Sequence, residues 1–222
     1  HIEQKIIMKD SVSSLAAISN GLGGFVIEQT QVRAPVGNEV RVQMAAAGIC
    51  HTDQQSLSWD GPLILGHEGA GWIESIGPNV KGLTVGQPVL LNWAIPCGQC
   101  RPCTNAQGHL CDRTQGLSKE SPSIDSPHTL WQNQTVRRSF NLGTFSEFTL
   151  VREEALTPLP TSMDMTHACI LGCGVMTGVG SVVNSAKVKA GDSVVVMGCG
   201  GVGLSVIQGA RIAGAKTIIA LD

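Results

Sequence analysis

The sequence predicts an α/β protein, with a β-rich domain over residues 1–172 followed by the first β-α-β unit of a parallel sheet over residues 173–222. Two observations carry this prediction. Short runs of β-forming residues, separated by Gly, Pro and Asn, fill much of the first part. Near the end, a continuous apolar run precedes a glycine-rich turn and a helical segment, which is typical of a parallel strand buried on both faces.

The β-rich part contains five candidate strands, which we expect to form an antiparallel, barrel-like structure. They are FVIEQTQV (25–32), EVRVQM (39–44), GWIESIG (71–77), QPVLLNW (87–93) and FSEFTLV (145–151). Before the last of them, residues 97–142 are polar and irregular. We expect this stretch to build little apolar core of its own and to need a cross-link, such as a bound metal ion, to stay folded.

The second part begins with a helical segment, 163–187, that we expect to be broken near Gly172 and Gly174. Residues 193–222 then read as strand, glycine turn, helix and strand, the order that opens a Rossmann domain. A complete Rossmann sheet has about six strands, and this sequence supplies the first two. We therefore expect the chain to be part of a longer polypeptide.

The charge pattern argues against several kinds of partner. The 15 basic and 17 acidic residues are scattered, so no patch for nucleic acid or an anionic membrane is predicted. There is no run of about eighteen apolar residues, and the first residues do not read as a signal peptide. We expect a cytoplasmic protein with neither nucleic acid nor membrane as a partner.

Four of the eight cysteines follow the spacing C-x2-C-x2-C-x7-C, within PCGQCRPCTNAQGHLC. Short C-x2-C steps let the sulfurs converge, and a longer loop brings in a fourth to complete a tetrahedron. Four thiolates leave no open position, so we predict a structural zinc site in a lobe at 95–113. The ligands are Cys97, Cys100, Cys103 and Cys111.

Other interpretations of these cysteines are an iron–sulfur cluster and a group of free thiols or disulfides. A zinc finger for nucleic acid would need basic residues along a nearby helix, and the lobe offers only Arg101 and Arg113. We interpret His109, inside the loop, as a polar surface residue.

Two further motifs, GICHTD (48–53) and LGHEGAG (65–71), contain ligands that suit zinc, Cys50 and His67. Either residue alone is more often a buried small side chain or a hydrogen-bonded polar one. The two motifs occur in one order with the four-cysteine lobe, GCGVMTGVG (172–180) and the glycine turn.

In this order, from about Val26 to Asp222, the motifs resemble the zinc-dependent alcohol dehydrogenases of the medium-chain dehydrogenase superfamily. The resemblance implies a GroES-like fold for the β-rich catalytic domain. It also implies two zinc ions per chain, NAD as cofactor and a small alcohol or aldehyde as substrate. A full-length member would form a homodimer or homotetramer.

The resemblance further implies that Cys50, His67 and Cys173 bind a catalytic zinc with an open fourth position. Such a metal polarises the alcohol oxygen before hydride is transferred to NAD. Asp53 would accept a hydrogen bond from the imidazole of His67, and Glu68 would lie close to the metal.

Three more roles come from the resemblance. Thr52 matches the hydroxyl that bonds the substrate oxygen and starts a proton relay, and His51 matches a residue that contacts cofactor phosphate and could act as a base. Gln55 departs from the family, because many members have a histidine there that continues the relay. Trp93 falls where the family places a bulky residue of the alcohol pocket, although core packing is an equal alternative.

The cofactor signal is G-x-G-x-x-G within GCGGVG, directly after an apolar strand. The first glycine makes the tight turn, the second lets the backbone approach pyrophosphate, and the third allows helix and strand to pack closely. The helix N-terminus then faces the phosphates. The turn residues are Gly198, Gly200, Gly201, Val202 and Gly203.

Asp222 ends the next strand, where a carboxylate bonds the ribose hydroxyls and repels a 2′-phosphate, so NAD is favoured over NADP. The resemblance places Thr177 and Val202 near the nicotinamide. We interpret Cys199 as a small residue at the end of the strand.

Other functions stay open. A catalytically inactive, zinc-stabilised module would need only the four-cysteine lobe. A glutathione-dependent formaldehyde dehydrogenase shares TFSEF and GCGVMTGVGS, but its acidic substrate contacts are hard to place here, and we rank a plain alcohol above a thiol adduct. A zinc-free quinone reductase would not need Cys50, His67 and Cys173 together.

Overall fold

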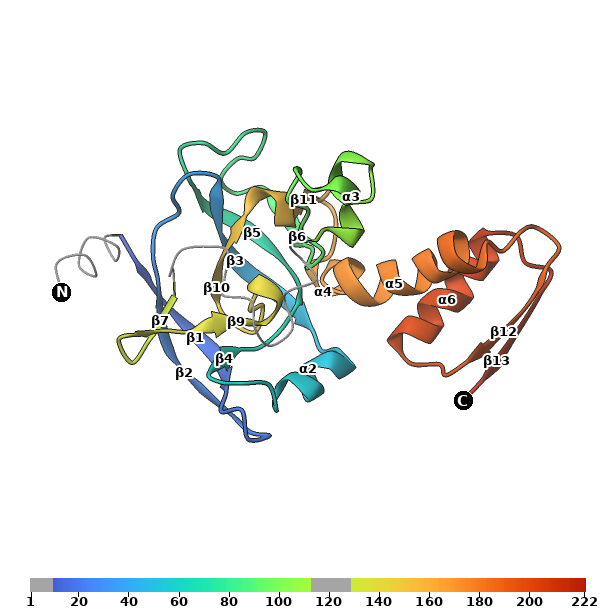
Figure 1. The fold of residues 1–222 in the computed structure, drawn as a ribbon, viewed down its shortest axis with the longest axis horizontal. Helices are drawn as coiled ribbons and strands as arrows, with labels where there is room; N and C mark the ends of the chain where they lie inside the picture. Colours follow the sequence, from blue (N-terminus) through green and yellow to red (C-terminus); the bar gives the residue numbers. More distant parts are fainter. Residues whose placement is uncertain (1–9, 113–128) are drawn as a thin grey trace. The chain divides into compact units, whose positions relative to one another are not determined.

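The computed structural model describes residues 10–112 and 129–222 (Figure 1). Arg113, the last residue of the predicted zinc lobe, lies outside the described residues. The chain divides into two compact units after Cys169.

The first unit is built on two sheets (Figure 1). The six-stranded sheet has the order β8-β7-β2-β1-β4-β9, and the five-stranded sheet has the order β10-β3-β5-β6-β11. Neighbouring strands run antiparallel except β4 and β9. The bounds are β1 (Val12–Ser19), β2 (Phe25–Val32), β3 (Glu39–Gly48), β4 (Leu63–Ile64), β5 (Glu68–Ile76), β6 (Pro88–Leu91), β7 (Thr129–Trp131), β8 (Gln134–Thr135), β9 (Arg137–Arg138), β10 (Phe148–Arg152) and β11 (Leu156–Pro158).

The helices of this unit are short. They are α2 (His51–Ser56), α3 (Arg101–Thr104) and α4 (Met165–Ala168), with 3-10 turns η1 (Gly108–Leu110), η3 (Ser139–Asn141) and η4 (Glu153–Ala155).

The segment just before β10, which contains Phe145 and Glu147, forms backbone hydrogen bonds with both sheets. Backbone N–H of Ala17 in β1 donates to the carbonyl of Phe145 at 2.8 Å, and Glu147 donates to Leu15 at 2.9 Å. On the other side, Met44 of β3 donates to the carbonyl of Glu147 at 2.9 Å. The segment therefore joins the two sheets, and the predicted barrel-like architecture is confirmed.

Of the two apolar clusters among the described residues, the larger lies on the five-stranded sheet. Alternating residues of β3, Val40 and Val42, point into it and are fully buried, as is Val89 of β6. Val40 and Val42 alternate with Glu39 and Arg41 along β3, so the apolar side chains lie on one face of the strand.

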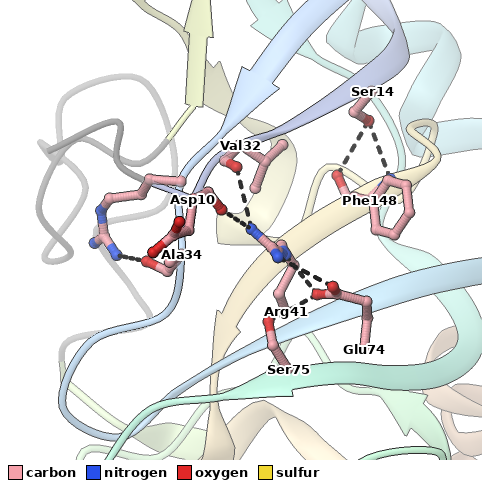
Figure 2. Close-up of polar contacts among 9 residues, drawn as sticks. Asp10, Ser14, Val32, Ala34, Arg41, Glu74, Ser75 and Phe148 are labelled. Atoms are coloured by element: carbon pink, nitrogen blue, oxygen red, sulfur yellow. Dashed lines mark hydrogen bonds and ion pairs between the residues drawn. The ribbon is translucent and has the colours of Figure 1, made fainter. Parts of the chain in front are cut away.

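Arg41, on the opposite face of β3, is also buried. Figure 2 shows its guanidinium paired with Glu74 of β5 through two hydrogen bonds, Nε to Oε2 at 2.6 Å and Nη2 to Oε1 at 3.0 Å. Nη1 donates to the backbone carbonyls of Asp10 and Val32. The hydrogen bond from Arg41 lowers the pKa of the Glu74 carboxyl, helped by the hydroxyl of Ser75 and opposed by partial burial.

Two features of this unit differ from the prediction. The sequence analysis placed no strand before Phe25, yet β1 is central in its sheet, pairing with both β2 and β4. Its sequence, VSSLAAIS, is rich in small residues, which give a weak strand signal. The stretch 97–142 also contributes to the core, because Val136 and Leu142 are buried.

The second unit holds the predicted β-α-β order (Figure 1). Strands β12 (Ser193–Met197) and β13 (Thr217–Leu221) pair in parallel, and α6 (Gly201–Ile212) connects them. Before them lie η5 (Leu171–Val175), α5 (Met176–Gly180) and η6 (Ser181–Ala186). Helix α5 packs closely on α6, since a Cβ added at Gly178 would lie 2.5 Å from the Cβ of Ser205.

The predicted break at Gly172 and Gly174 is wrong. The chain stays helical there and widens into π-type turns, in which the N–H of Val175 donates to the carbonyl of Ile170 at 3.2 Å. The stretch Met165–Ala186 is long and apolar enough to cross a membrane by length and composition alone. This is weak evidence, because core helices of soluble proteins pass the same test.

Candidate metal and cofactor sites

The four cysteines of the lobe converge. Cys100 and Cys103 lie at α3, and Cys111 follows η1. All four sulfurs lie within 4.8 Å of one another, with Cys97 Sγ 4.0 Å from Cys103 Sγ and Cys100 Sγ 3.8 Å from Cys111 Sγ. Tetrahedral zinc with Zn–S bonds of about 2.3 Å separates its sulfurs by about 3.8 Å. The donor set and its spacing therefore fit zinc.

Backbone amides point at these sulfurs. The N–H groups of Gln99 and Cys100 donate to Cys97 Sγ at 3.5 and 3.3 Å, and the N–H of Cys97 donates to Cys111 Sγ at 3.3 Å. The two bonds to Cys97 lower the pKa of its thiol to about 6. Desolvation raises the pKa of the Cys103 thiol to about 11. The lobe thus stabilises one thiolate by itself, and a cation would stabilise the others.

A second group of metal-ligating side chains lies in the first unit. Cys50 directly precedes α2, His67 directly precedes β5, and Glu68 is the first residue of β5. Their ligand atoms lie within 4.8 Å of one another, and both His67 and Glu68 are buried. A thiol, an imidazole and a carboxylate at this spacing can bind a divalent zinc ion.

Asp53 fixes the geometry of two of these ligands. Its Oδ2 accepts the backbone N–H of Cys50 at 2.8 Å, and its Oδ1 lies 2.9 Å from Nδ1 of His67. With Nδ1–H donated to a buried carboxylate, the lone pair of His67 is on Nε2. This is the contact that the family resemblance implied for Asp53.

The other predicted residues of this region lie on α2 or in the second unit. His51 and Gln55 are exposed on α2, and Thr52 beside them is half-buried. Cys173 lies in η5 of the second unit and is half-buried.

Sequence reasoning missed an aromatic cluster beside His67. The ring of Phe140 lies 4.9 Å from that of His67, 5.7 Å from Trp59 and 5.5 Å from Trp93, measured between centroids. Trp93 also packs on the main apolar cluster, and its Nε1 is buried with no hydrogen-bond partner among the described residues. Phe140 adopts a left-handed backbone conformation, φ 51°, for which a phenylalanine gives no sequence signal.

The glycine turn of the second unit has the geometry that its motif requires. Gly198 has a positive φ of 92°, which favours glycine. A Cβ on Gly203 would lie 1.8 Å from the carbonyl oxygen of Gly198, so only glycine fits there. A Cβ on Gly200 would meet nothing within 4 Å, which leaves room for a phosphate over the N-terminus of α6.

Asp222 stands beside this turn. Its Oδ1 accepts the backbone N–H of Cys199 at 3.1 Å, and the residue directly follows β13. Thr177 on α5 and Val202 on α6 belong to the two helices that pack together at Gly178. The space and donors at this turn fit a dinucleotide, with a carboxylate at the ribose position.

Fold and motifs together define an alcohol dehydrogenase domain. A family model described as the alcohol dehydrogenase GroES-like domain matches residues 37–161. The chain belongs to this family, and its resemblance to the zinc-dependent alcohol dehydrogenases of the medium-chain superfamily is confirmed.

Individual relatives agree. Alcohol dehydrogenase 6 from Rattus norvegicus is 38% identical over 203 residues, which cover 89% of this chain and 54% of that protein. S-(hydroxymethyl)glutathione dehydrogenase from Saccharomyces cerevisiae is 38% identical over 204 residues, covering 88% of this chain and 53% of that protein. The chain spans about half the length of these curated relatives.

Solved structures give the same fold. An alcohol dehydrogenase zinc-binding domain protein from Burkholderia ambifaria matches with a TM-score of 0.89 and 36% identity, over 96% of this chain and 60% of that one. Benzyl alcohol dehydrogenase from Acinetobacter calcoaceticus matches with a TM-score of 0.86 and 33% identity, over 95% of this chain and 59% of that one.

Proposed function

We propose that this chain is part of an NAD-linked dehydrogenase that interconverts an alcohol and an aldehyde or ketone. It carries the zinc-binding domain and the first β-α-β unit of the cofactor-binding domain. The observation that carries the proposal is the contact between His67 and Asp53 beside Cys50, because it prepares a buried imidazole as a metal ligand. A zinc ion bound there would act as a Lewis acid toward the alcohol oxygen.

Cys173 is proposed as the third ligand, on the strength of its place in the GCGVMTGVG motif. Three residues of the chain then have separate roles in orienting the ligand and moving the proton. Asp53 holds His67 in one tautomer, and Thr52 accepts and passes on the substrate's hydroxyl proton. His51, which is exposed at the start of α2, receives that proton. Gln55 cannot take up a proton, so the relay ends at His51 or in water.

NAD is the proposed cofactor. The glycine turn leaves space for pyrophosphate at the start of α6, and the carboxylate of Asp222 would bond the ribose hydroxyls and repel a 2′-phosphate. Thr177 and Val202 are proposed to contact the nicotinamide. Two zinc ions per chain, a homo-oligomer of the full-length protein and a reducing compartment such as the cytoplasm belong to the same proposal.

The aromatic cluster favours a slender or aromatic primary alcohol. The ring of Phe140 lies beside His67, and Trp59 and Trp93 lie beside Phe140, so this cluster offers apolar faces on which an aryl or allylic group can stack. The structural similarity to a benzyl alcohol dehydrogenase supports this class. The second candidate is a thiol adduct, which the similarity to S-(hydroxymethyl)glutathione dehydrogenases favours.

Metal analysis tests the proposal first. We expect two zinc ions per chain by mass spectrometry of the purified protein, falling to one in Cys50→Ser. One zinc ion in the unmodified chain would instead support an inactive zinc module, and none would contradict both functions.

NADH formation is then measured with benzyl alcohol, ethanol and S-(hydroxymethyl)glutathione, using a protein that spans the full length of the curated relatives. We expect benzyl alcohol to give the highest kcat/KM, and Cys50→Ser to abolish turnover with all three. A preference for the glutathione adduct would overturn the substrate class while leaving the metal assignment standing.

A further inference from the structure

His67 and Glu68 lie on a stretch of chain that runs beside the segment just before β10. The backbone N–H of Thr144 donates to the carbonyl of Gly66 at 3.1 Å, and the next N–H along the chain donates to the carbonyl of the residue before Gly66 at 2.9 Å. The backbone that carries the two proposed metal ligands is therefore bonded to a segment far away in the sequence.

The side chain of Thr144 lies against a glycine on each side of these ligands. A Cβ added at Gly66 would stand 2.5 Å from Oγ1 of Thr144, and a Cβ added at Gly69 would stand 2.8 Å from its Cγ2. Both distances are well below van der Waals contact, so Thr144 occupies the space that a side chain at either glycine would need.

The two glycines make this packing important. Gly66 turns the chain directly before the ligands with a φ of 92°, which favours glycine. Glycine also gives the backbone more conformational freedom than other residues do, so a stretch with glycines on both sides of its ligands needs packing from elsewhere to hold one conformation. Thr144, which is 1% exposed, supplies that packing.

The hydroxyl of Thr144 does not act through a hydrogen bond. Its Oγ1 is buried and has no hydrogen-bond partner among the described residues. A buried hydroxyl without a partner is unfavourable, and its replacement by a methyl group of the same shape leaves no polar atom unsatisfied. The contribution of Thr144 to this region is therefore the shape of its side chain.

We propose that Thr144 is a positioning residue for His67 and Glu68, an inference that rests on the proposed function of these residues as zinc ligands. Thr144 fills the space beside the two glycines and so fixes the backbone from which both ligands project. Asp53 holds the imidazole of His67 through Nδ1, while Thr144 holds the backbone of the same residue. With ring and backbone both fixed, Nε2 of His67 is oriented before a metal ion arrives.

The test compares Thr144→Ala, which removes both γ atoms, with Thr144→Val, which keeps the shape without the hydroxyl. We expect Thr144→Ala to weaken zinc binding at Cys50 and His67 by about tenfold in competition with a chelator, because the ligands lose their fixed positions. Thr144→Val should bind zinc as the unmodified chain does. Thr144→Ser, which lacks only Cγ2, should lie between them.

A second readout needs no metal. In the metal-free chain with isotope-labelled histidine, the Nδ1 proton of His67 is hydrogen-bonded to Asp53, and NMR measures its exchange with solvent. We expect faster exchange in Thr144→Ala and unchanged exchange in Thr144→Val.

Val40→Ala is the matched control, because it also removes two γ atoms from a fully buried side chain. Val40 pairs with Ile76, at the opposite end of the β3–β5 pair from Glu68. This variant should lower the free energy of unfolding and leave both readouts unchanged. Thermal unfolding checks that each variant is folded.

The proposal is overturned if folded Thr144→Ala leaves either readout as it is in the unmodified chain. It is also overturned if Val40→Ala or Thr144→Val changes the readouts as much as Thr144→Ala does. If Thr144→Ala does not fold, Thr144→Ser decides in the same way. A chain that binds no second zinc ion would contradict the proposed function, and the Nδ1 proton of metal-free His67 would then decide the role of Thr144 by itself.

Discussion

Asp53 is the residue that orients the second group of metal-ligating side chains, which comprises Cys50, His67 and Glu68. One oxygen of its carboxylate takes the backbone N–H of Cys50, and the other contacts Nδ1 of His67. Both partners are thereby oriented by one buried side chain at the start of a six-residue helix. An outer carboxylate of this kind raises the basicity of the ligating imidazole.

Asp53→Asn should therefore weaken zinc binding at Cys50 and His67 by about 10- to 100-fold, because the neutral amide stabilises the ligating imidazole less than the carboxylate does. Competition with a zinc chelator measures the affinity. Asp60→Asn is the control, since Asp60 is exposed and forms no hydrogen bond or ion pair among the described residues. Equal affinities in Asp53→Asn and Asp60→Asn would show that the contact has no influence on the metal.

At the scale of one element, the pairing of strands β3 and β5 encloses one buried charge, the guanidinium of Arg41. Arg41 is enclosed on the outer face of β3, and Glu74 of β5 accepts two of its hydrogen bonds (Figure 2). Glu74→Gln should lower the free energy of unfolding by about 1–3 kcal/mol at pH 7, because the guanidinium loses its charged acceptor.

The pH dependence follows from the sign of the pKa shift. The pKa of Glu74 is lowered in the folded state, so its stabilising contribution is complete above the ordinary carboxyl pKa and is lost as the pH falls through the folded value. The difference in unfolding free energy between the unmodified chain and Glu74→Gln should therefore shrink below pH 4.5. Urea unfolding at several pH values measures it.

Glu154→Gln provides the comparison, because Glu154 pairs with Arg152 in a more exposed position and should cost less than about 1 kcal/mol. A difference for Glu74→Gln that stays constant from pH 7 to pH 4 would contradict the assignment.

At the scale of the whole molecule, the first unit combines apolar cores with a metal-dependent lobe. The two apolar clusters are made of side chains from the strands and their connections, and none of the four lobe cysteines belongs to them. Removing zinc should therefore expose the lobe cysteines while the backbone hydrogen bonds to Cys97 and the β-sheets are kept, in contrast to small domains whose whole fold depends on the metal.

We expect the far-UV circular dichroism spectrum to keep its β-sheet signal after chelation, while the lobe cysteines become open to alkylation. At pH 7, Cys97, with a thiol pKa of about 6, should react before Cys103, whose pKa of about 11 keeps it protonated. Peptide mapping by mass spectrometry measures the order. Equal alkylation rates of Cys97 and Cys103 would contradict the assigned order of their thiol pKa values. Loss of the β-sheet signal would show that the sheets also depend on zinc.

The sequence by itself determined the family, the order of the two parts and the candidate ligands. Local patterns carry that information: the spacing of four cysteines, the alternation in β3 and the glycine turn, where a Cβ on Gly203 would collide with the carbonyl of Gly198. Such constraints act between near neighbours in the chain, so they leave a readable spacing.

Only the tertiary structure decided what depends on distant partners. β1 is a central strand because β2 and β4 pair with it, although its small residues signal no strand. Phe140 reaches His67 from a left-handed turn more than seventy residues away in the chain. Glu28 and Trp131 meet through β2 and β7. Burial, pairing and ring packing are set by the complete fold, and no local pattern records them.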